Sequence, residues 1–296
     1  MTTLRLGTRG SDLALWQSRW VIDRLRKRHP SLTIQEVIIK THGDEARDQR
    51  FDQDWPVGGF VGAIEQALSE KKIDFAVHSY KDLPSAETPG LVIAAVPGRE
   101  LVHDVLVTRD AFDLSSLPPG FRIGTSSPRR SAQFRMHADV EIVPIRGNVA
   151  TRIAKIETEG LDGVVLAAAG LKRLGIEVDH RIDLPTDRFI PTPSQGALAI
   201  QTRLHGETER LIAAIDEPTA HSGVRAERAF LRRVGAGCQV AIGALSCVEK
   251  SDISLHGQLF SEDGERVAEG HGNGTDPEVI GASLADRLIQ ELGGSL

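Results

Sequence analysis

The sequence predicts an α/β protein of two lobes followed by a small α+β domain. Strand-like and helix-like segments alternate along most of the chain, which is typical of α/β lobes. Two segments marked by proline, Pro97-Gly98 and residues 185–193, look like crossovers that leave one lobe and return to it. From Pro218 onward the pattern changes to one long helix, a hairpin and a final helix, which indicates a separate α+β domain.

Composition excludes several classes of protein. The chain has 296 residues, of which 40% are hydrophobic and 26% are charged, as in soluble globular proteins of two or three domains. Its formal net charge of −6 excludes a general attraction to nucleic acid or to an anionic membrane, so any basic site must be local. No apolar run is long enough to span a membrane, and no signal-peptide pattern is present. The two cysteines form neither a disulfide scaffold nor a metal-ligand pattern, so we expect a cytoplasmic protein.

The chain opens with a β-α-β unit. Residues 4–8 and 32–39 have the pattern of strands, and Ser11 or Asp12 caps the helix between them, which favours a parallel sheet. Arg9 and Ser11 follow the first strand, at the carboxyl edge of the sheet, where ligands bind in open α/β folds. Arg9 is therefore a candidate binding residue, and a charge in a surface turn is the alternative.

A second candidate pair follows a polar loop. Residues 41–58 are polar and lack periodicity, which predicts a long loop. Residues 60–68 predict a short amphipathic helix. A buried strand at 73–77 then leads to Lys81 and Asp82, again at the carboxyl end of a strand. These two side chains form either a surface ion pair of little energy or a pair that stabilises a cation in a site.

Arginines gather at two neighbouring strand-to-helix turns. Ser127 caps one helix after a strand at 121–123, and Asn148 caps another after a strand at 140–145. Helix N-termini and guanidinium groups both attract anions, so these turns predict a ligand with several carboxylates or phosphates. The alternative is that the arginines are solvated surface charges. The residues concerned are Arg129, Arg130, Arg146 and Arg152.

The remaining elements complete the two lobes and the C-terminal domain. Arg173, in a short helical turn at 171–175, joins the candidate anion site. A helix at 218–234 is expected to present a mostly solvated face that contains Arg225, Arg228, Arg232 and Arg233. The other predicted elements are strands at 91–96, 104–107, 162–168, 197–201, 240–248 and 253–260, a hairpin strand at 266–269, and a helix that starts at Asp276.

The two cysteines differ in their surroundings. The segment Gly235-Ala236-Gly237-Cys238-Gln239 indicates a tight and approachable loop, so the thiol of Cys238 is a candidate nucleophile or point of covalent attachment. Burial as a small hydrophobic side chain is the alternative. Cys247 lies inside an apolar strand, where we expect it to pack inertly.

Six sequence blocks, in the same order, match one protein family. The chain resembles the porphobilinogen deaminase family, also called hydroxymethylbilane synthase, over nearly its whole length. Any single block would be weak, whereas the six together are highly specific. The blocks are Thr8–Ser11 with Leu13–Gln17, His78–Pro84, Gly124–Arg130, Arg146–Asn148 with Thr151-Arg152, Ala168–Gly175, and Gly237–Gln239.

The resemblance implies two α/β lobes like those of periplasmic binding proteins and a third domain that carries the cysteine. The expected lobes are residues 1–97 with 196–213 and residues 102–190, and the expected C-terminal α+β domain is residues 217–296. The resemblance also implies a cytoplasmic monomer whose partner is the small-molecule substrate porphobilinogen, with no nucleic acid, no membrane and no metal.

The resemblance further implies a transferase with a dipyrromethane cofactor, joined to Cys238 through a thioether. Four porphobilinogen units are added head to tail, each with loss of ammonia, and water releases linear hydroxymethylbilane for porphyrin and heme biosynthesis. Loss of ammonia leaves an electron-poor azafulvene, and a preformed carboxylate stabilises the positive charge that develops. Each pyrrole carries an acetate and a propionate, so the growing chain accumulates carboxylates for arginines to bind.

The implied roles fall on matching positions of this sequence. The expected catalytic residues are Asp82 and Lys81. The residues expected to hold the cofactor are Cys238, Lys81, Asp82, Ser127, Arg129, Arg130 and Arg146. The residues expected to bind substrate are Arg9, Ser11, Thr125, Ser126, Arg146, Asn148, Arg152 and Arg173.

The sequence departs from the family pattern at several positions. The usual lid motif Gly-Gly-Lys-Gly-Leu-Phe is shortened, since Gly58-Gly59 leads directly to Phe60. This shortened motif motivates one alternative to an active enzyme, a degenerate relative that keeps the cofactor without turnover. A second alternative is a non-enzymatic anion-binding module of the same two-lobed fold. The other substituted positions are His42 and His103 (usually arginine), Ser194 (usually glycine) and Ala241 (usually proline).

Overall fold

A computed structural model describes residues 2–40, 61–235 and 241–294. The chain divides into two compact units, and each is described by itself. The first unit contains Met1–Glu100 and Gly196–Val224, and the second contains Leu101–Gln195 and Arg225–Leu296. The predicted polar loop at 41–58 and the predicted loop that contains Cys238 lie outside the described residues.

The first unit is built on a five-stranded sheet in the order β2-β1-β3-β10-β4. β1 runs parallel to β2 and β3, whereas β10 is antiparallel to both β3 and β4, so the expected parallel sheet is in fact mixed. The strands are β1 (Thr3–Thr8), β2 (Thr33–Ile38), β3 (Phe75–Ser79), β4 (Leu91–Ala95) and β10 (Leu198–Arg203). The helices are α1 (Asp12–Arg28), α3 (Gly62–Ser69), the 3₁₀ turn η2 (Tyr80–Asp82) and α7 (Glu207–Ala213).

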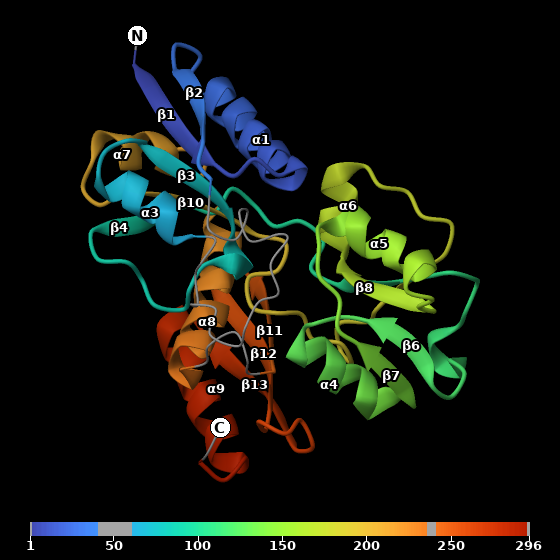
Figure 1. Ribbon diagram of the computed structural model, residues 1–296. Coiled ribbons are helices and arrows are strands. Elements are labelled where there is room, and N and C mark those ends of the chain that lie inside the picture. Colours follow the sequence, from blue (N-terminus) through green and yellow to red (C-terminus); the bar gives the residue numbers. More distant parts are fainter. Residues whose placement is uncertain (1, 41–60, 236–240, 295–296) are drawn as a thin grey trace. The chain divides into compact units, whose positions relative to one another are not determined.

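The lobe of the second unit repeats this strand arrangement in the order β7-β6-β8-β5-β9. β6, labelled with β7 and β8 in Figure 1, runs parallel to both of them. β5 returns antiparallel to β8. Its strands are β5 (Asp104–Thr108), β6 (Phe121–Gly124), β7 (Val140–Val143), β8 (Gly163–Ala167) and β9 (Arg181–Asp183). Its helices are the 3₁₀ turn η3 (Leu114–Ser116), α4 (Pro128–His137), α5 (Val149–Thr158) and α6 (Ala168–Leu174).

The C-terminal domain packs two helices against a three-stranded antiparallel sheet. Phe230, Leu255 and Leu284 are fully or almost fully buried in its core. Gly281 is required where the helices cross, since a Cβ there would lie 2.3 Å from the carbonyl oxygen of Ala226. The elements are α8 (Pro218–Val234), β11 (Ile242–Glu249), β12 (Asp252–Phe260), β13 (Val267–Gly274) and α9 (Pro277–Glu291). The predicted class, two α/β lobes and a small α+β domain, is confirmed.

Two predictions of side-chain environment were wrong. Cys247 is exposed, because β11 is an edge strand and every second residue near its end faces away from the core. Arg228 is only 4% exposed, because α8 is covered on more than one side and the run Ala226–Phe230 is buried throughout. An apolar run or a helical charge spacing does not show how many faces of an element its neighbours cover. The sequence patterns also missed β9 and α7, both of which are short.

Ser194 occupies a backbone conformation that suits glycine. Its φ is +67°, its side chain is fully buried, and its hydroxyl has no hydrogen-bond partner among the described residues. Its backbone N–H is held at 2.6 Å by Oε2 of the buried Glu227. A left-handed conformation costs a non-glycine residue about 1 kcal/mol, and an unpartnered buried hydroxyl adds to that cost.

The variant Ser194→Gly is therefore expected to raise the free energy of unfolding by about 1 kcal/mol. The urea midpoint of unfolding measures this change. Ser194→Ala is the matched control, since it removes the hydroxyl but keeps the strained φ. A lower urea midpoint for Ser194→Gly than for the wild type would contradict the argument.

Candidate active site

Two strand ends of the first unit bring the predicted residues of that unit to one edge. β1 and β3 are parallel neighbours, so the turns that follow them lie at the same carboxyl edge of the sheet. Arg9 and Ser11 follow β1, and the Ser11 hydroxyl caps α1 by accepting from the Ala14 N–H. Gln17 of α1 donates to the Ser79 hydroxyl at 2.8 Å, which ties this helix to the end of β3.

Lys81 and Asp82 stand on a tight turn with buried anchors on either side. Tyr80 and Leu83 are each 7% exposed, the Tyr80 N–H donates to the Ala197 carbonyl at 3.0 Å, and the Leu83 N–H donates to the Tyr80 carbonyl. Between these anchors, Lys81 is half-buried and Asp82 is exposed. The turn therefore presents a carboxylate to its surroundings on a fixed backbone.

Three turns of the second unit converge in the same way. β7, β6 and β8 are parallel neighbours, so the turns after them share one edge of the sheet. The Ser126 hydroxyl donates to the Ile145 carbonyl at 2.8 Å and thus joins the turns after β6 and β7. Thr125 is buried, and its hydroxyl accepts from the Ser127 N–H at 3.2 Å.

The predicted helix caps of these turns are confirmed. The Ser127 hydroxyl accepts from the Arg130 N–H at the start of α4, and Asn148 Oδ1 accepts from the Thr151 N–H at the start of α5. Around them, Arg146 is exposed, and Arg152 donates from Nε to the Gly147 carbonyl at 2.8 Å. Arg173, on α6 after β8, is only 8% exposed.

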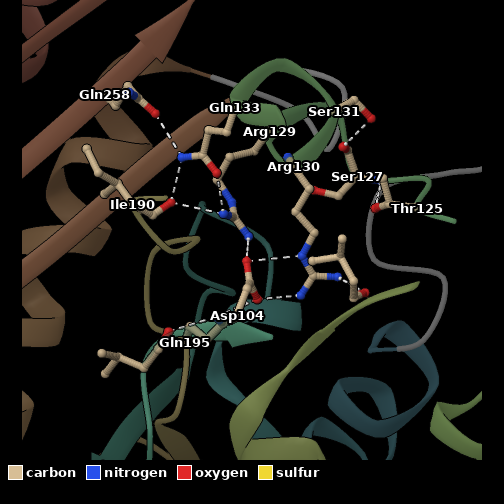
Figure 2. Close-up of polar contacts among 12 residues, drawn as sticks. Asp104, Thr125, Ser127, Arg129, Arg130, Ser131, Gln133, Ile190, Gln195 and Gln258 are labelled. Carbon is tan, nitrogen blue, oxygen red and sulfur yellow. Dashed lines mark hydrogen bonds and ion pairs between the residues drawn. The ribbon is translucent and has the colours of Figure 1, made fainter. Parts of the chain in front are cut away.

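The two arginines at the start of α4 are buried around a single carboxylate (Figure 2). Arg130 makes a bidentate contact with Asp104, with Nη2 at 2.6 Å from Oδ1 and Nε at 3.1 Å from Oδ2. Arg129 donates from Nη2 to Oδ2 at 2.7 Å, and the Gln195 amide donates to Oδ1 at 2.9 Å. All four residues are at most 8% exposed.

The direction of β5 explains why Asp104 reaches these arginines. Asp104 is the first residue of β5 and pairs with Ala167, the last residue of β8, because the two strands are antiparallel. The start of β5 therefore lies at the edge where β6, β7 and β8 end. Burial alone would raise the pKa of Asp104, but the charges of Arg130 and Arg129 outweigh burial and hold that pKa well below its usual range.

The buried cluster carries an excess of positive charge. Two guanidinium groups share one carboxylate, and Arg129 Nε is buried without a hydrogen-bond partner among the residues that the structure describes. Burial lowers the pKa of Arg129, while Asp104 acts in the opposite direction. A buried positive charge and an unpartnered donor both favour a nearby anion, so this edge is suited to bind a carboxylate.

The structure divides the predicted residues between the two units. Asp104, Gln133 and Gln195 were not predicted as site residues, because none of them stands in an arginine-rich turn. Asp104 opens a predicted strand, and only the antiparallel return of β5 places it at the site. The first unit holds Arg9, Ser11, Lys81 and Asp82, and the second holds Thr125, Ser126, Ser127, Arg129, Arg130, Arg146, Asn148, Arg152 and Arg173.

Comparison with known proteins shows which family shares these features. A sequence profile described as "Porphobilinogen deaminase, dipyromethane cofactor binding domain" matches residues 4–210. A second, described as the C-terminal domain of porphobilinogen deaminase, matches residues 222–290. The chain belongs to the porphobilinogen deaminase family. Its activity is therefore that of a hydroxymethylbilane synthase, and its cofactor is a dipyrromethane.

Individual porphobilinogen deaminases match the chain nearly end to end. The one from Roseiflexus sp. (strain RS-1) is 42% identical over 298 residues, which covers 99% of this chain and 98% of the relative. The one from Geotalea uraniireducens (strain Rf4) is 44% identical over 299 residues, which covers 99% of this chain and 93% of the relative. The BenM effector-binding domain is a distant structural likeness, with 16% identity, a TM-score of 0.44 and coverage of 72% of this chain and 90% of that domain.

The buried arginine cluster fits the cofactor of porphobilinogen deaminases. A dipyrromethane carries acetate and propionate groups, and the cluster offers excess positive charge together with Arg129 Nε, a donor that no described residue satisfies. Within the described ranges, every helix is too short or too polar to cross a lipid bilayer. The same ranges contain no group of three or more His, Cys, Asp and Glu residues placed to hold a metal ion.

Proposed function

We propose that this chain is a transferase in which Cys238 holds the dipyrromethane and the arginine-rich turns bind the growing tetrapyrrole. Four porphobilinogen molecules are joined head to tail, four ammonia molecules leave, and water then releases linear hydroxymethylbilane. The observation that supports this proposal best is the buried Asp104-Arg129-Arg130 cluster, in which two guanidinium groups share one carboxylate. The cluster lies at the edge of the second unit's five-stranded sheet, where three strand-to-helix turns meet.

Apart from Arg146, different arginines bind the carboxylates of the cofactor and those of the substrate. Arg129 and Arg130, fixed by Asp104, hold the carboxylates of the cofactor from a rigid, buried position together with Ser127 and the exposed Arg146. The substrate carboxylates bind mainly to Arg9, Ser11, Thr125, Ser126, Arg146, Asn148, Arg152 and Arg173. Helix N-termini at α1, α4 and α5 supply further positive potential.

Asp82 is the residue that assists the chemical step. The bound cofactor supplies the pyrrole carbon that becomes linked to the first substrate. The Asp82 carboxylate accepts hydrogen bonds from pyrrole N–H groups. It also stabilises the positive charge that develops on the reacting ring as ammonia leaves. Because its turn is anchored by Tyr80 and Leu83, little reorganisation is needed when that charge appears. Lys81 holds a cofactor carboxylate beside it.

We propose that the protein has three domains and is a monomer. Residues 1–97 with 196–213 and residues 102–190 form the lobes, and residues 217–296 form the C-terminal domain with Cys238. We place the protein in the cytoplasm as a monomer that binds porphobilinogen and no nucleic acid. The net charge of −6 supports the part of this assignment that concerns nucleic acid, because it gives the chain no general attraction to a polyanion.

Incubation of the purified protein with porphobilinogen tests the proposed reaction. We expect one ammonia released for each porphobilinogen consumed and one hydroxymethylbilane formed from four porphobilinogen molecules. The shortened lid at Gly58-Gly59-Phe60 favours a rival, a degenerate relative that keeps its cofactor without turnover. Stable binding of porphobilinogen without release of ammonia would support that rival and contradict the proposed reaction.

A further inference from the structure

One face of α4 joins the buried arginine cluster to the C-terminal domain. Arg129, Ala132 and Gln133 lie three and four residues apart, so they share one side of the helix. Ala132 packs with Ala241 and Phe260 of the C-terminal domain in a small hydrophobic cluster. Gln133 is fully buried and makes a hydrogen bond to the same domain (Figure 2).

The hydrogen bonds of this contact have a defined direction. Arg129 can only donate, so Gln133 must present Oε1 to Arg129 Nη1, at 2.9 Å. Gln133 Nε2 therefore donates to Gln258 Oε1 at 2.8 Å, and Gln258 Nε2 donates to Glu269 Oε2 at 2.7 Å. Both glutamines are at most 2% exposed. Thus a chain of donors runs from the arginine to Glu269 on β13, and Gln258 is its link in the C-terminal domain.

A second contact reinforces the same connection. The Ile190 carbonyl accepts from both Arg129 Nη1 and Gln133 Nε2, each at 2.9 Å. β11 holds this segment, since the Ala244 N–H donates to the Pro191 carbonyl at 2.9 Å. Gly243 is required there, because a Cβ would lie 2.9 Å from the Ile190 carbonyl oxygen. The C-terminal domain therefore contacts both groups that accept from Arg129 Nη1.

We infer that Gln258 is a positioning residue, which fixes the guanidinium of Arg129 through Gln133. Without the Gln258 oxygen, one buried N–H of Gln133 would lose its acceptor. The Gln133 amide would then lower its free energy by rotating away from Arg129. The contact between α4 and the C-terminal domain, which carries Cys238, thereby sets the geometry of Arg129, the arginine that is proposed to bind the cofactor. This inference rests on the proposed function only for its effect on turnover.

A direct readout of Arg129 tests the inference without reference to activity. In protein labelled with ¹⁵N-arginine, the Nε–H resonance of Arg129 is assigned by its loss in Arg129→Lys. Gln258→Met, which keeps the size of the side chain but removes both polar groups, is expected to shift this resonance. Gln290→Met on the exposed side of α9 is the matched control and should leave it in place. An unshifted resonance in Gln258→Met would overturn the inference.

Steady-state kinetics then show whether Gln258 acts through Gln133. We expect kcat/KM for porphobilinogen to fall about tenfold in Gln258→Met and in Gln133→Met, and to fall no further in the double variant. If kcat/KM of the double variant fell about a hundredfold, the product of the two single losses, the two residues would act independently. That result would contradict an action of Gln258 through Gln133. A wild-type protein that makes no hydroxymethylbilane would contradict the proposed function, while the arginine resonance would still decide the role of Gln258.

A charge-conserving exchange provides the rescue. In the double variant Gln258→Glu with Glu269→Gln, residue 258 still accepts from Gln133, and residue 269 donates to residue 258 and accepts from His256. This variant should regain the wild-type Arg129 resonance and a kcat/KM within about threefold of wild type. Failure of the exchange to restore either quantity would count against the inference, because all the hydrogen bonds of the chain are preserved.

Discussion

Replacing Asp104 with alanine is expected to lower the free energy of unfolding by about 3–5 kcal/mol, the largest effect on stability of any substitution discussed for this chain. The reason is burial: Asp104 is 1% exposed and is the carboxylate that Arg129 and Arg130 share. Its removal leaves two guanidinium groups in a low-dielectric site without their counter-charge. Asp104→Asn should be less damaging, since the amide oxygen still accepts, although its NH₂ group opposes the arginine donors.

Urea unfolding measures this loss, and Asp286→Ala is the matched control. Asp286 also pairs with an arginine, Arg233, but both side chains are more than half exposed, so the cost should be within about 1 kcal/mol. Because the native pKa of Asp104 lies below its unfolded value, its contribution is fully present above about pH 4. The contribution disappears only as the pH falls further, through the native pKa. Equal losses in the two variants at pH 7 would show that burial of the cluster carries no special energy.

Replacing Asp82 with alanine is expected to have the largest effect on catalysis. Asp82 is exposed on a turn held by Tyr80 and Leu83, so its loss should change the free energy of unfolding by no more than about 0.5 kcal/mol. Turnover should fall by about a hundredfold or more, as when one preorganised group that stabilises developing charge is removed. The covalent cofactor should remain attached, because the reaction that needs Asp82 is chain elongation.

Two measurements on the same sample check this prediction: the rate of hydroxymethylbilane formation and the mass of the intact protein. Asp23→Ala removes another exposed carboxylate, on α1, and is expected to leave both quantities at the wild-type level. If Asp82→Ala turned over like the wild type, Asp82 would have no place in the mechanism. If it lacked the adduct, Asp82 would be needed to assemble the cofactor rather than to use it.

Local signals in the sequence were sufficient for most of the fold. Ser127 and Asn148 cap α4 and α5 as predicted, because capping depends on a residue and its next three neighbours. The direction of β10 was beyond such signals, since a strand pairs with partners far away in the chain. The shared order of the two five-stranded sheets likewise emerges only from pairing, and the sequence shows no internal repeat.

The candidate site could be predicted in composition but not in detail. Arg129 and Arg130 were recognised as anion-binding candidates, yet their burial around Asp104 depends on the antiparallel return of β5. The link from Gln133 to Gln258 joins residues 125 positions apart, and nothing in either local sequence marks it. Long-range contacts of this kind decide which arginine is rigid, whereas the resemblance to a family identifies only which arginines are candidates.

The mass of the intact protein tests the central claim, attachment of the cofactor through Cys238, most directly. Protein purified from a cell that makes porphobilinogen should carry a covalent adduct of two pyrrole rings, and Cys238→Ala should have the unmodified mass. Cys247→Ala is the control: it removes an exposed thiol of β11 and should keep the adduct. An unmodified wild-type chain, or an adduct that persists in Cys238→Ala, would contradict the account.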